Sequence, residues 1–340
     1  MTTGRGQVEK MVTSRFSQLR RAVGVGFVFG VLALAAGPHE AAAQGLTYTS
    51  GQSLSPAFEG WEVNPDGSFN LLFGYMNRNW EEEPNVQIGD DNHFSPGPAD
   101  RGQPTHFLPR RNRFVFKVQV PADFGEQELA WTVRVNGVEK AAYGSLKPDY
   151  FVDNMVIMSE TGTLGPGTSN PELRAHTAPV VELEMDSVID ARVGQPVTLV
   201  AYVTDDGLPR RGGGGFFGGG GGLPITDEGT LNLARAIRPP GRITVAKVLG
   251  LHMTWYVYRA PVGGGVSFDP VQISTWEDTR PYSNSPWSPS WVPPDLPEDG
   301  RWVTEVTFHE PGTYVLQGRA DDGGLFTDKR VTVRVSRPVL

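Results

Sequence analysis

A period of two in the placement of large apolar residues limits the fold of this chain more than any other feature. Between 114 and 120 every second residue is Phe or Val, and between 129 and 135 every second residue is Leu, Trp or Val. A period of two is typical of a β-strand with one buried face. Gly and Pro, at 42 and 28 of 340 residues, also disfavour a helical bundle. The sequence therefore predicts an all-β fold.

Turn residues connect these segments. Asn136-Gly137 supplies the two positive-φ positions of a tight hairpin, after which residues 138–143 form the returning strand. The turn Asn64-Pro65-Asp66-Gly67 opens another strand over 68–75, whereas 81–113 is a long polar stretch broken by Pro. We predict two β-sandwich domains in tandem. The predicted divisions are a signal peptide at 1–43, a first sandwich at 44–160, a linker at 161–178 and a second sandwich at 179–340.

The N-terminus has the three parts of a secretory signal. Arg20-Arg21 precedes the apolar run 23–36, and Ala41-Ala42-Ala43 precedes Gln44. A membrane-anchoring helix is the alternative, but the run is shorter than the roughly 20 apolar residues that cross a bilayer. We therefore expect a cleaved leader, an exported periplasmic or extracellular protein, and no membrane-spanning segment.

Charge and cysteine content exclude several classes of protein. The chain has 30 Lys and Arg against 38 Asp and Glu, a net charge of −8. Because nucleic-acid binding needs a basic surface, no nucleic-acid partner is expected. There is no cysteine, so disulfides, thiolate metal sites and a cysteine nucleophile are excluded.

The second half contains a recognisable order of motifs. An opening strand at Val193–Leu199 leads to the turn Asp205–Gly207; a central strand contains Trp255; Phe308–Leu316 and the turn Ala320–Gly323 follow. Over about 179–338 this order resembles the immunoglobulin-like sandwich, most closely the polycystic-kidney-disease type of domain. The first half resembles no family that we recognise.

The resemblance predicts specific contacts inside the second domain. Tyr314 stands two residues before Leu316, the spacing of a tyrosine corner whose hydroxyl binds the backbone, and Trp255 would pack against Leu316. Two long insertions, 210–247 and 262–300, depart from the family pattern. Domains of this type mostly act as spacers or binding modules, so the resemblance implies a non-catalytic role, although a fold alone does not fix function.

A cluster of aromatic residues in the second insertion is the leading candidate for a ligand site. It comprises Trp276, Tyr282, Trp287 and Trp291, in a segment stiffened by several Pro residues. Flat rings on a stiff loop suit stacking on a sugar or on a partner protein. The alternative is that the rings cover the open end of the sandwich as a small core.

Two other segments, a glycine tract and an acidic turn, are weaker candidates for ligand sites. The glycine tract 212–222 lacks the Lys-Ser/Thr of a phosphate-binding loop, and its pair Phe216-Phe217 either tucks back or offers a contact. Asp90, Asp91 and Asn92 are the candidate ligands for Ca²⁺, the one cofactor considered, although Asp and Asn are also ordinary turn residues. No catalytic residue is predicted, because no nucleophile elbow or metalloprotease motif is present.

These features favour an exported, non-catalytic module at the cell envelope that contacts a glycan or protein partner through loops of its second domain. Two alternatives stay open. One is a secreted glycan-active hydrolase or lyase with a carboxylate pair in the first domain, since 36 acidic residues remain after position 43. The other is a periplasmic subunit of an envelope assembly that binds by strand addition.

Overall fold

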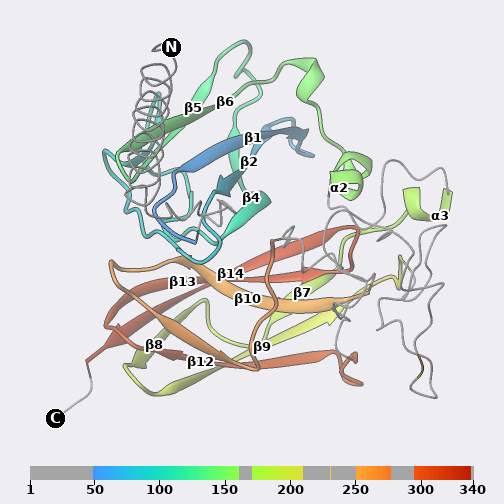
Figure 1. Ribbon diagram of the computed structural model, residues 1–340. Coiled ribbons are helices and arrows are strands. Elements are labelled where there is room, and N and C mark those ends of the chain that lie inside the picture. Colours follow the sequence, from blue (N-terminus) through green and yellow to red (C-terminus); the bar gives the residue numbers. More distant parts are fainter. Residues whose placement is uncertain (1–48, 161–170, 210–229, 231–249, 277–294, 338–340) are drawn as a thin grey trace, which may run out of the picture. The chain divides into compact units, whose positions relative to one another are not determined.

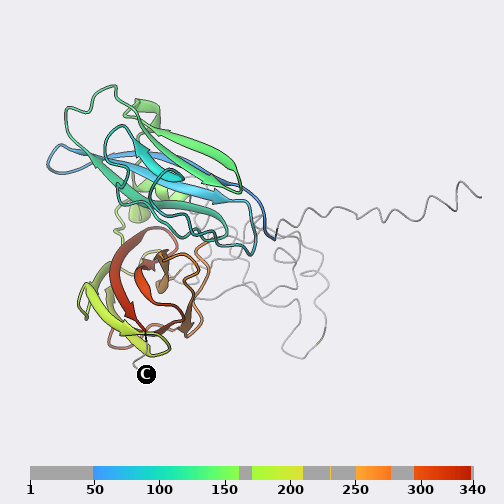
Figure 2. The ribbon, with the colours of Figure 1, turned by 90° about the vertical axis from the view of Figure 1, so that its left-hand side faces the viewer.

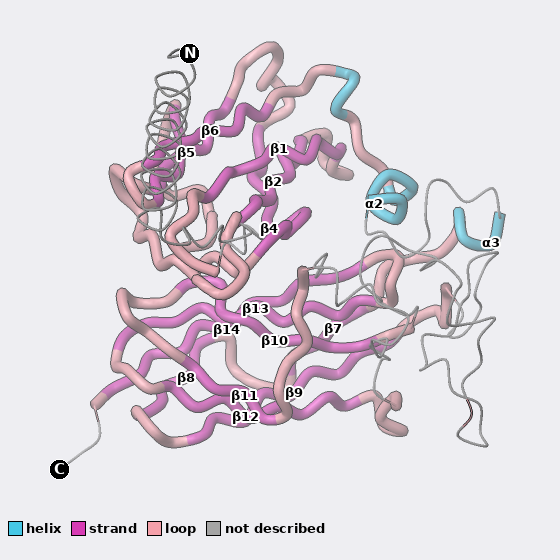
Figure 3. The backbone as a smooth tube through the Cα atoms, viewed as in Figure 1, coloured by secondary structure: helices cyan, strands magenta, loops and turns pink. Residues whose placement is uncertain are grey.

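The computed structural model describes residues 49–160, 171–209, 230, 250–276 and 295–337. The predicted leader at 1–43, the Phe216-Phe217 pair and three of the four clustered aromatic residues lie outside these ranges. Residues Tyr48–Leu340 form one compact unit. The described chain is almost entirely strand and loop, with helix only in the stretch that follows the first six strands, as Figure 3 shows.

The first six strands form a sandwich of two antiparallel, three-stranded sheets (Figure 1). One sheet has the order β1-β2-β4, with β1 at Leu54–Val63, β2 at Phe69–Asn77 and β4 at Arg110–Val120. The other has the order β3-β5-β6, with β3 at Asn92–Ser95, β5 at Leu129–Val135 and β6 at Val138–Gly144. The predicted hairpin is confirmed, because Asn136 and Gly137 join β5 to β6 with φ of 52° and 75°.

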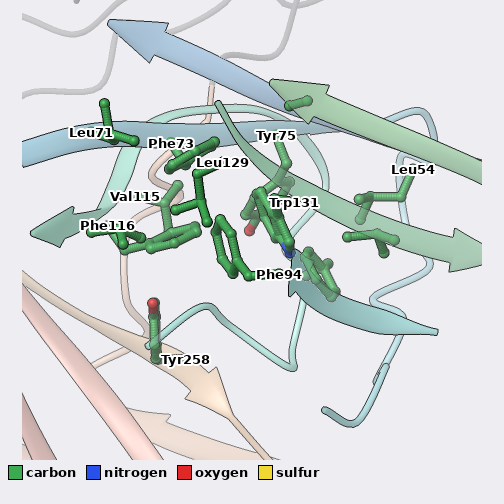
Figure 4. Close-up of a cluster of buried hydrophobic side chains, with 14 of the residues drawn as sticks. Leu54, Leu71, Phe73, Tyr75, Phe94, Val115, Phe116, Leu129, Trp131 and Tyr258 are labelled. Atoms are coloured by element: carbon green, nitrogen blue, oxygen red, sulfur yellow. The ribbon is translucent and has the colours of Figure 1, made fainter. Parts of the chain in front are cut away.

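Aromatic rings fill the core between these two sheets (Figure 4). Trp131 is fully buried, and its ring lies 5.0 Å from that of Phe116 and 6.0 Å from that of Phe94. Its indole N–H donates to Oδ1 of Asn92 at 2.9 Å, so the polar atom of this large side chain is satisfied inside the core. The alternating residues of β5 therefore face inward as the sequence predicts. In β4 the prediction holds from Phe116 on, but it is wrong for Phe114, which has a φ of 50° and packs in a separate cluster with Leu72 and Val152.

Short helices follow the first sandwich: a 3₁₀ turn at Pro148–Tyr150, α2 at Asn154–Glu160 and α3 at Pro171–Arg174. Ile157 of α2 packs beside Leu72 and Phe114 of the first sandwich. The described parts of the predicted linker therefore include α3.

The remaining strands form a second sandwich with immunoglobulin-like strand order. One sheet has the order β7-β9-β12-β11 and the other β10-β13-β14-β8. The strands are β7 at Val180–Leu183, β8 at Val188–Arg192, β9 at Pro196–Thr204, β10 at His252–Arg259, β11 at Val266–Asp269, β12 at Arg301–Phe308, β13 at Gly312–Asp321 and β14 at Phe326–Ser336. In chain order these sheets correspond to the ABED and CFG sheets of that fold, with β8 added parallel to β14. Figure 2 views this sandwich nearly along its strands.

The core of the second sandwich contains the residues that carried the resemblance. Trp255 and Leu316 are both buried in it, and Tyr314 packs against Phe308 at 4.7 Å between ring centroids. The Tyr314 hydroxyl donates to the backbone carbonyl of Glu310 at 2.8 Å. The predicted tyrosine corner is therefore confirmed. The narrower prediction of a polycystic-kidney-disease type stays a prediction.

The outer face of the β10-β13-β14 sheet packs on the first sandwich. Tyr258 belongs to the first core cluster, and Figure 4 shows its ring reaching toward that cluster from β10. Gln317 donates to the backbone carbonyl of Val115 at 3.3 Å, and Arg259 forms a two-pronged ion pair with Asp100 at 2.7 and 3.0 Å. This face is therefore occupied by the protein's own first sandwich.

Candidate functional site

Three connections of the second sandwich meet at one end of it, which we call the loop end. The register pairs His252 with Asp321, Asp321 with Phe326, and Arg301 with Tyr202. The ends of β9 and β13 and the starts of β10, β12 and β14 therefore lie side by side. Because β11 runs antiparallel to β12, the chain that leaves Asp269 heads toward the same end. The first insertion, 210–247, starts and finishes here. The second, 262–300, starts at the opposite end, after β10, and includes β11; its part after Asp269 starts and finishes at the loop end.

The described part of the second insertion that follows β11 is anchored on both sandwiches. Oε1 of Gln272 accepts a hydrogen bond of 2.8 Å from the backbone N–H of Trp255 in the edge strand β10. Three residues later, the Thr275 hydroxyl donates to Oδ1 of the buried Asn112 in β4 at 3.1 Å. Trp276 follows directly and is half-buried. The chain thus reaches the aromatic segment along a fixed path.

Of the four predicted aromatic ligand residues, Trp276 alone lies in the described chain. Tyr282, Trp287 and Trp291 lie outside the described residues, so their role stays a prediction.

A buried charged cluster at the loop end was missed by sequence reasoning. His176, just before β7, places Nε2 3.0 Å from Oδ2 of Asp322, and both side chains are at most 1% exposed. The next residue, Thr177, donates from its backbone N–H and its hydroxyl to Oδ2 of Asp206 at 2.8 and 3.0 Å. The sequence predicts a turn at each of the two Asp-Asp-Gly sequences, but not that they meet. His176 lies 146 residues before its partner Asp322 in the sequence, and no local sequence pattern spans such a separation.

Burial and mutual repulsion shift the titration of this cluster. Burial, together with the nearby charges of Asp322 and Asp206, raises the pKa of Asp205 to about 6. Burial also raises the pKa of Asp322, against the opposing effect of its hydrogen bond to His176. For His176, burial acts to lower the pKa, but the hydrogen bond and charge of Asp322 outweigh it, so the pKa lies above its ordinary value. Groups with shifted pKa values often mark functional sites, and structural ion pairs produce such shifts too.

The predicted calcium ligands do not converge in the structure. Asp90 and Asp91 are exposed, and Oδ1 of Asp91 lies 3.2 Å from Nη1 of Arg134. The side chain of Asn92 points into the core, where its Nδ2 donates to the carbonyl of Pro104 at 2.8 Å and its Oδ1 accepts from Trp131. Within the described ranges, no group of three or more His, Asp or Glu side chains is arranged to hold a metal ion.

Acidic side chains of the first sandwich are engaged in ion pairs. Glu59, whose side chain is 7% exposed, binds Nη2 of Arg111 at 2.7 Å. Oε2 of Glu83 lies 2.9 Å from Nε2 of His106, whose other ring nitrogen lies 3.0 Å from Oδ1 of Asn85. These pairs join neighbouring segments of the first sandwich, and they give no support to an opposed pair of catalytic carboxylates.

Three edge strands of the second sandwich have features that oppose pairing with another chain. The strands β7, β8 and β11 have 4, 5 and 4 residues. Each includes a charged residue: Glu182 in β7, Asp190 and Arg192 in β8, and Asp269 in β11. Short strands with charged residues are a common way to discourage strand addition. The strand-addition alternative therefore gains no support from these edges.

Comparisons with known proteins show similarity in solved structures only. No protein-family model matches the chain, and no curated protein matches it in sequence. Similar structures include the adhesin InvE of Yersinia pseudotuberculosis, at 11% identity and a TM-score of 0.22, where 85% of this chain and 61% of that chain are covered. Domains 1–6 of the surface layer protein SbsC match at 10% identity and a TM-score of 0.21, over 85% of this chain and 28% of that one.

A third similar structure is that of the fibronectin(III)-like modules of Clostridium thermocellum CbhA, at 9% identity and a TM-score of 0.20, covering 84% of this chain and 95% of that one. The chain thus spans less than two thirds of the length of the first two structures. The immunoglobulin-like assignment made above rests on strand order and register. In the described part of the chain, no helix has the length and apolarity to cross a membrane.

Proposed function

We propose that this protein is an exported, non-catalytic binding or structural module of the cell envelope, which contacts a glycan or protein partner through the loop end of its second sandwich. The observation that carries the proposal is that the first insertion and the part of the second insertion beyond β11 both leave and rejoin the sandwich at that end. Loops displayed together on a rigid sandwich form a binding surface whose chemistry can vary without disturbing the fold.

The arrangement of the second sandwich supports this choice of surface. Its β10-β13-β14 face is covered by the first sandwich, through residues such as Gln317. The segment that leads to Trp276 is anchored by Gln272 and Thr275, so the aromatic residues beyond it start from a fixed position. Anchoring reduces the entropy that is lost when a loop binds a partner.

The test is a binding assay with the aromatic residues removed. The protein and the double variant Trp287→Ala/Trp291→Ala are applied to a glycan array. Each is also immobilised and exposed to solubilised envelope proteins of the cell that produces the protein. We expect the wild type to retain a partner and the variant to lose it at least tenfold, because interface aromatics dominate binding energy.

The matched control is Tyr143→Ala, which removes a 61% exposed aromatic side chain from the first sandwich. It should bind as the wild type does. Equal retention by the wild type and the double variant, at equal melting temperature, would contradict the proposal.

A further inference from the structure

We propose that His176, Asp205 and Asp322 form a pH-sensitive switch that fastens the segment 171–179 to the loop end in mildly acidic solution and loosens it above neutral pH. This inference is independent of the proposed function, because it concerns how the chain that precedes β7 is held.

The segment is held by two consecutive residues on two different turns. His176 binds Oδ2 of Asp322, whose Oδ1 accepts the backbone N–H groups of Gly324 and Leu325 at 2.6 and 2.8 Å. Thr177 binds Asp206 in the turn that follows β9. Because the β13–β14 turn fixes the Asp322 carboxylate, the position of the imidazole depends on its own interaction with that carboxylate.

Two polar atoms in this cluster have unused hydrogen-bonding capacity. Nδ1 of His176 and Oδ1 of Asp205 are both buried and have no hydrogen-bond partner within the described residues. A buried polar atom without a partner is costly. Protonation of Nδ1 places a positive charge among three carboxylates, and protonation of Asp205 removes one of the negative charges.

The surrounding elements supply mainly negative charge. The turn after β9 supplies Asp205 and Asp206, and the end of β13 supplies Asp321 and Asp322. At the start of β10, His252 places Nδ1 3.2 Å from the carbonyl oxygen of Gly250. The segment itself includes the exposed residues Glu172 and Arg174. With carboxylates in the majority, a positive charge on His176 is favoured inside the cluster.

The direction of the pH effect follows from the sign of each shift. The pKa of His176 is raised above 6.5, so its contribution to stability is fully present below that value and is lost as pH rises through the folded-state pKa. The penalty for ionising Asp205, whose pKa is raised to about 6, accumulates between about pH 4 and about pH 6 and is nearly constant above, so it adds little to the difference between pH 6 and pH 8. The titration of His176 therefore strengthens the contact near pH 6 relative to pH 8. At much lower pH, protonation of Asp322 removes the ion pair.

Hydrogen exchange of the Thr177 backbone amide measures the contact directly, because that amide is bound to Asp206. After correction for the intrinsic rate, we expect slower exchange at pH 6 than at pH 8. In His176→Gln, which keeps a hydrogen-bond donor but cannot gain a charge, the difference between the two pH values should disappear. The control His309→Gln alters an exposed histidine at the end of β12 and should keep the difference.

Two results would overturn the proposal. One is wild-type Thr177 protection that is equal at the two pH values; the other is a His176→Gln variant that keeps the full pH dependence. If that variant fails to fold, an NMR titration of the histidines in the wild-type protein decides the matter. A His176 pKa at or below 6.5 would then refute the switch.

Discussion

Arg319 in β13 donates a hydrogen bond of 3.2 Å from Nη2 to the backbone carbonyl oxygen of Phe114 in β4, across the junction of the two sandwiches. The same guanidinium binds Asp328 of β14 through two hydrogen bonds of 2.8 Å, and only 8% of the residue is exposed. A buried charge that is paired with Asp328 thus stands where the two cores meet.

We predict that Arg319→Leu separates the unfolding of the two sandwiches. Removing the guanidinium leaves Asp328 without its partner and breaks the bond to Phe114, which should cost about 3–5 kcal/mol in the free energy of unfolding. Calorimetry should show one transition for the wild type and two for the variant. The exposed pair Arg301–Glu184 gives the control, since Arg301→Leu should cost less than about 1 kcal/mol. A single transition at an unchanged temperature in Arg319→Leu would show that Arg319 is not needed to couple the two sandwiches.

Gly318 is predicted to be required opposite Trp255. A Cβ at this position would lie 2.9 Å from the indole ring and 2.5 Å from Cε of Met253. Gly318→Ala should therefore destabilise the protein by about 1–3 kcal/mol, the usual cost of overpacking a core. Gly265→Ala is the matched control, because its Cβ would meet His309 at an ordinary 3.6 Å. Chemical denaturation of both variants measures the difference, and equal stability would count against the packing described here.

The tyrosine corner should contribute a measurable share of stability. Tyr314→Phe removes the hydroxyl that binds the carbonyl of Glu310 and leaves the ring in the core. We expect a loss of about 0.5–1.5 kcal/mol in the free energy of unfolding. Tyr143→Phe removes a hydroxyl from a residue that is 61% exposed and should have no effect. Urea denaturation that gives the two variants equal midpoints would contradict this assignment.

The pH dependence of stability should depend on Asp205. Burial raises its pKa from 3.8 to about 6, so ionisation disfavours the folded state. This penalty grows as pH rises from about 4 to about 6 and stays constant above. Asp205→Asn keeps an oxygen that can accept from Gly207 but cannot ionise, so the variant should gain in melting temperature at pH 7.5 relative to the wild type and gain nothing at pH 4. An equal shift at both pH values would point to a cause other than ionisation.

Much of the fold was predictable because local patterns determined it. Alternation located β4 and β5, and the Asn136-Gly137 turn fixed the hairpin between β5 and β6. The strand β1 was missed because Pro56 and a bulge between Phe58 and Gly60 interrupt its pattern. The strand β3 was missed because it has only four residues inside a polar stretch.

The junction and the loop-end cluster could not be predicted, because both depend on contacts between distant residues. Gln317 and Arg319 occupy the polar-looking face of β13, which in sequence is typical of a solvent-exposed face, yet the first sandwich covers it. His176 has no neighbouring residue in the sequence that indicates a buried partner. Burial against another domain leaves no local pattern in the sequence.

The parallel pairing of β8 with β14 determines how the second sandwich bears mechanical load. Five successive pairs, from Thr332–Val188 to Ser336–Arg192, join a strand near the start of this domain to its last strand. Tension applied to the chain before β8 and after β14 pulls two parallel strands in opposite directions along their length. All the hydrogen bonds between them are then sheared together instead of opening one after another, so a protein tethered at both ends would resist extension through this short pair of strands.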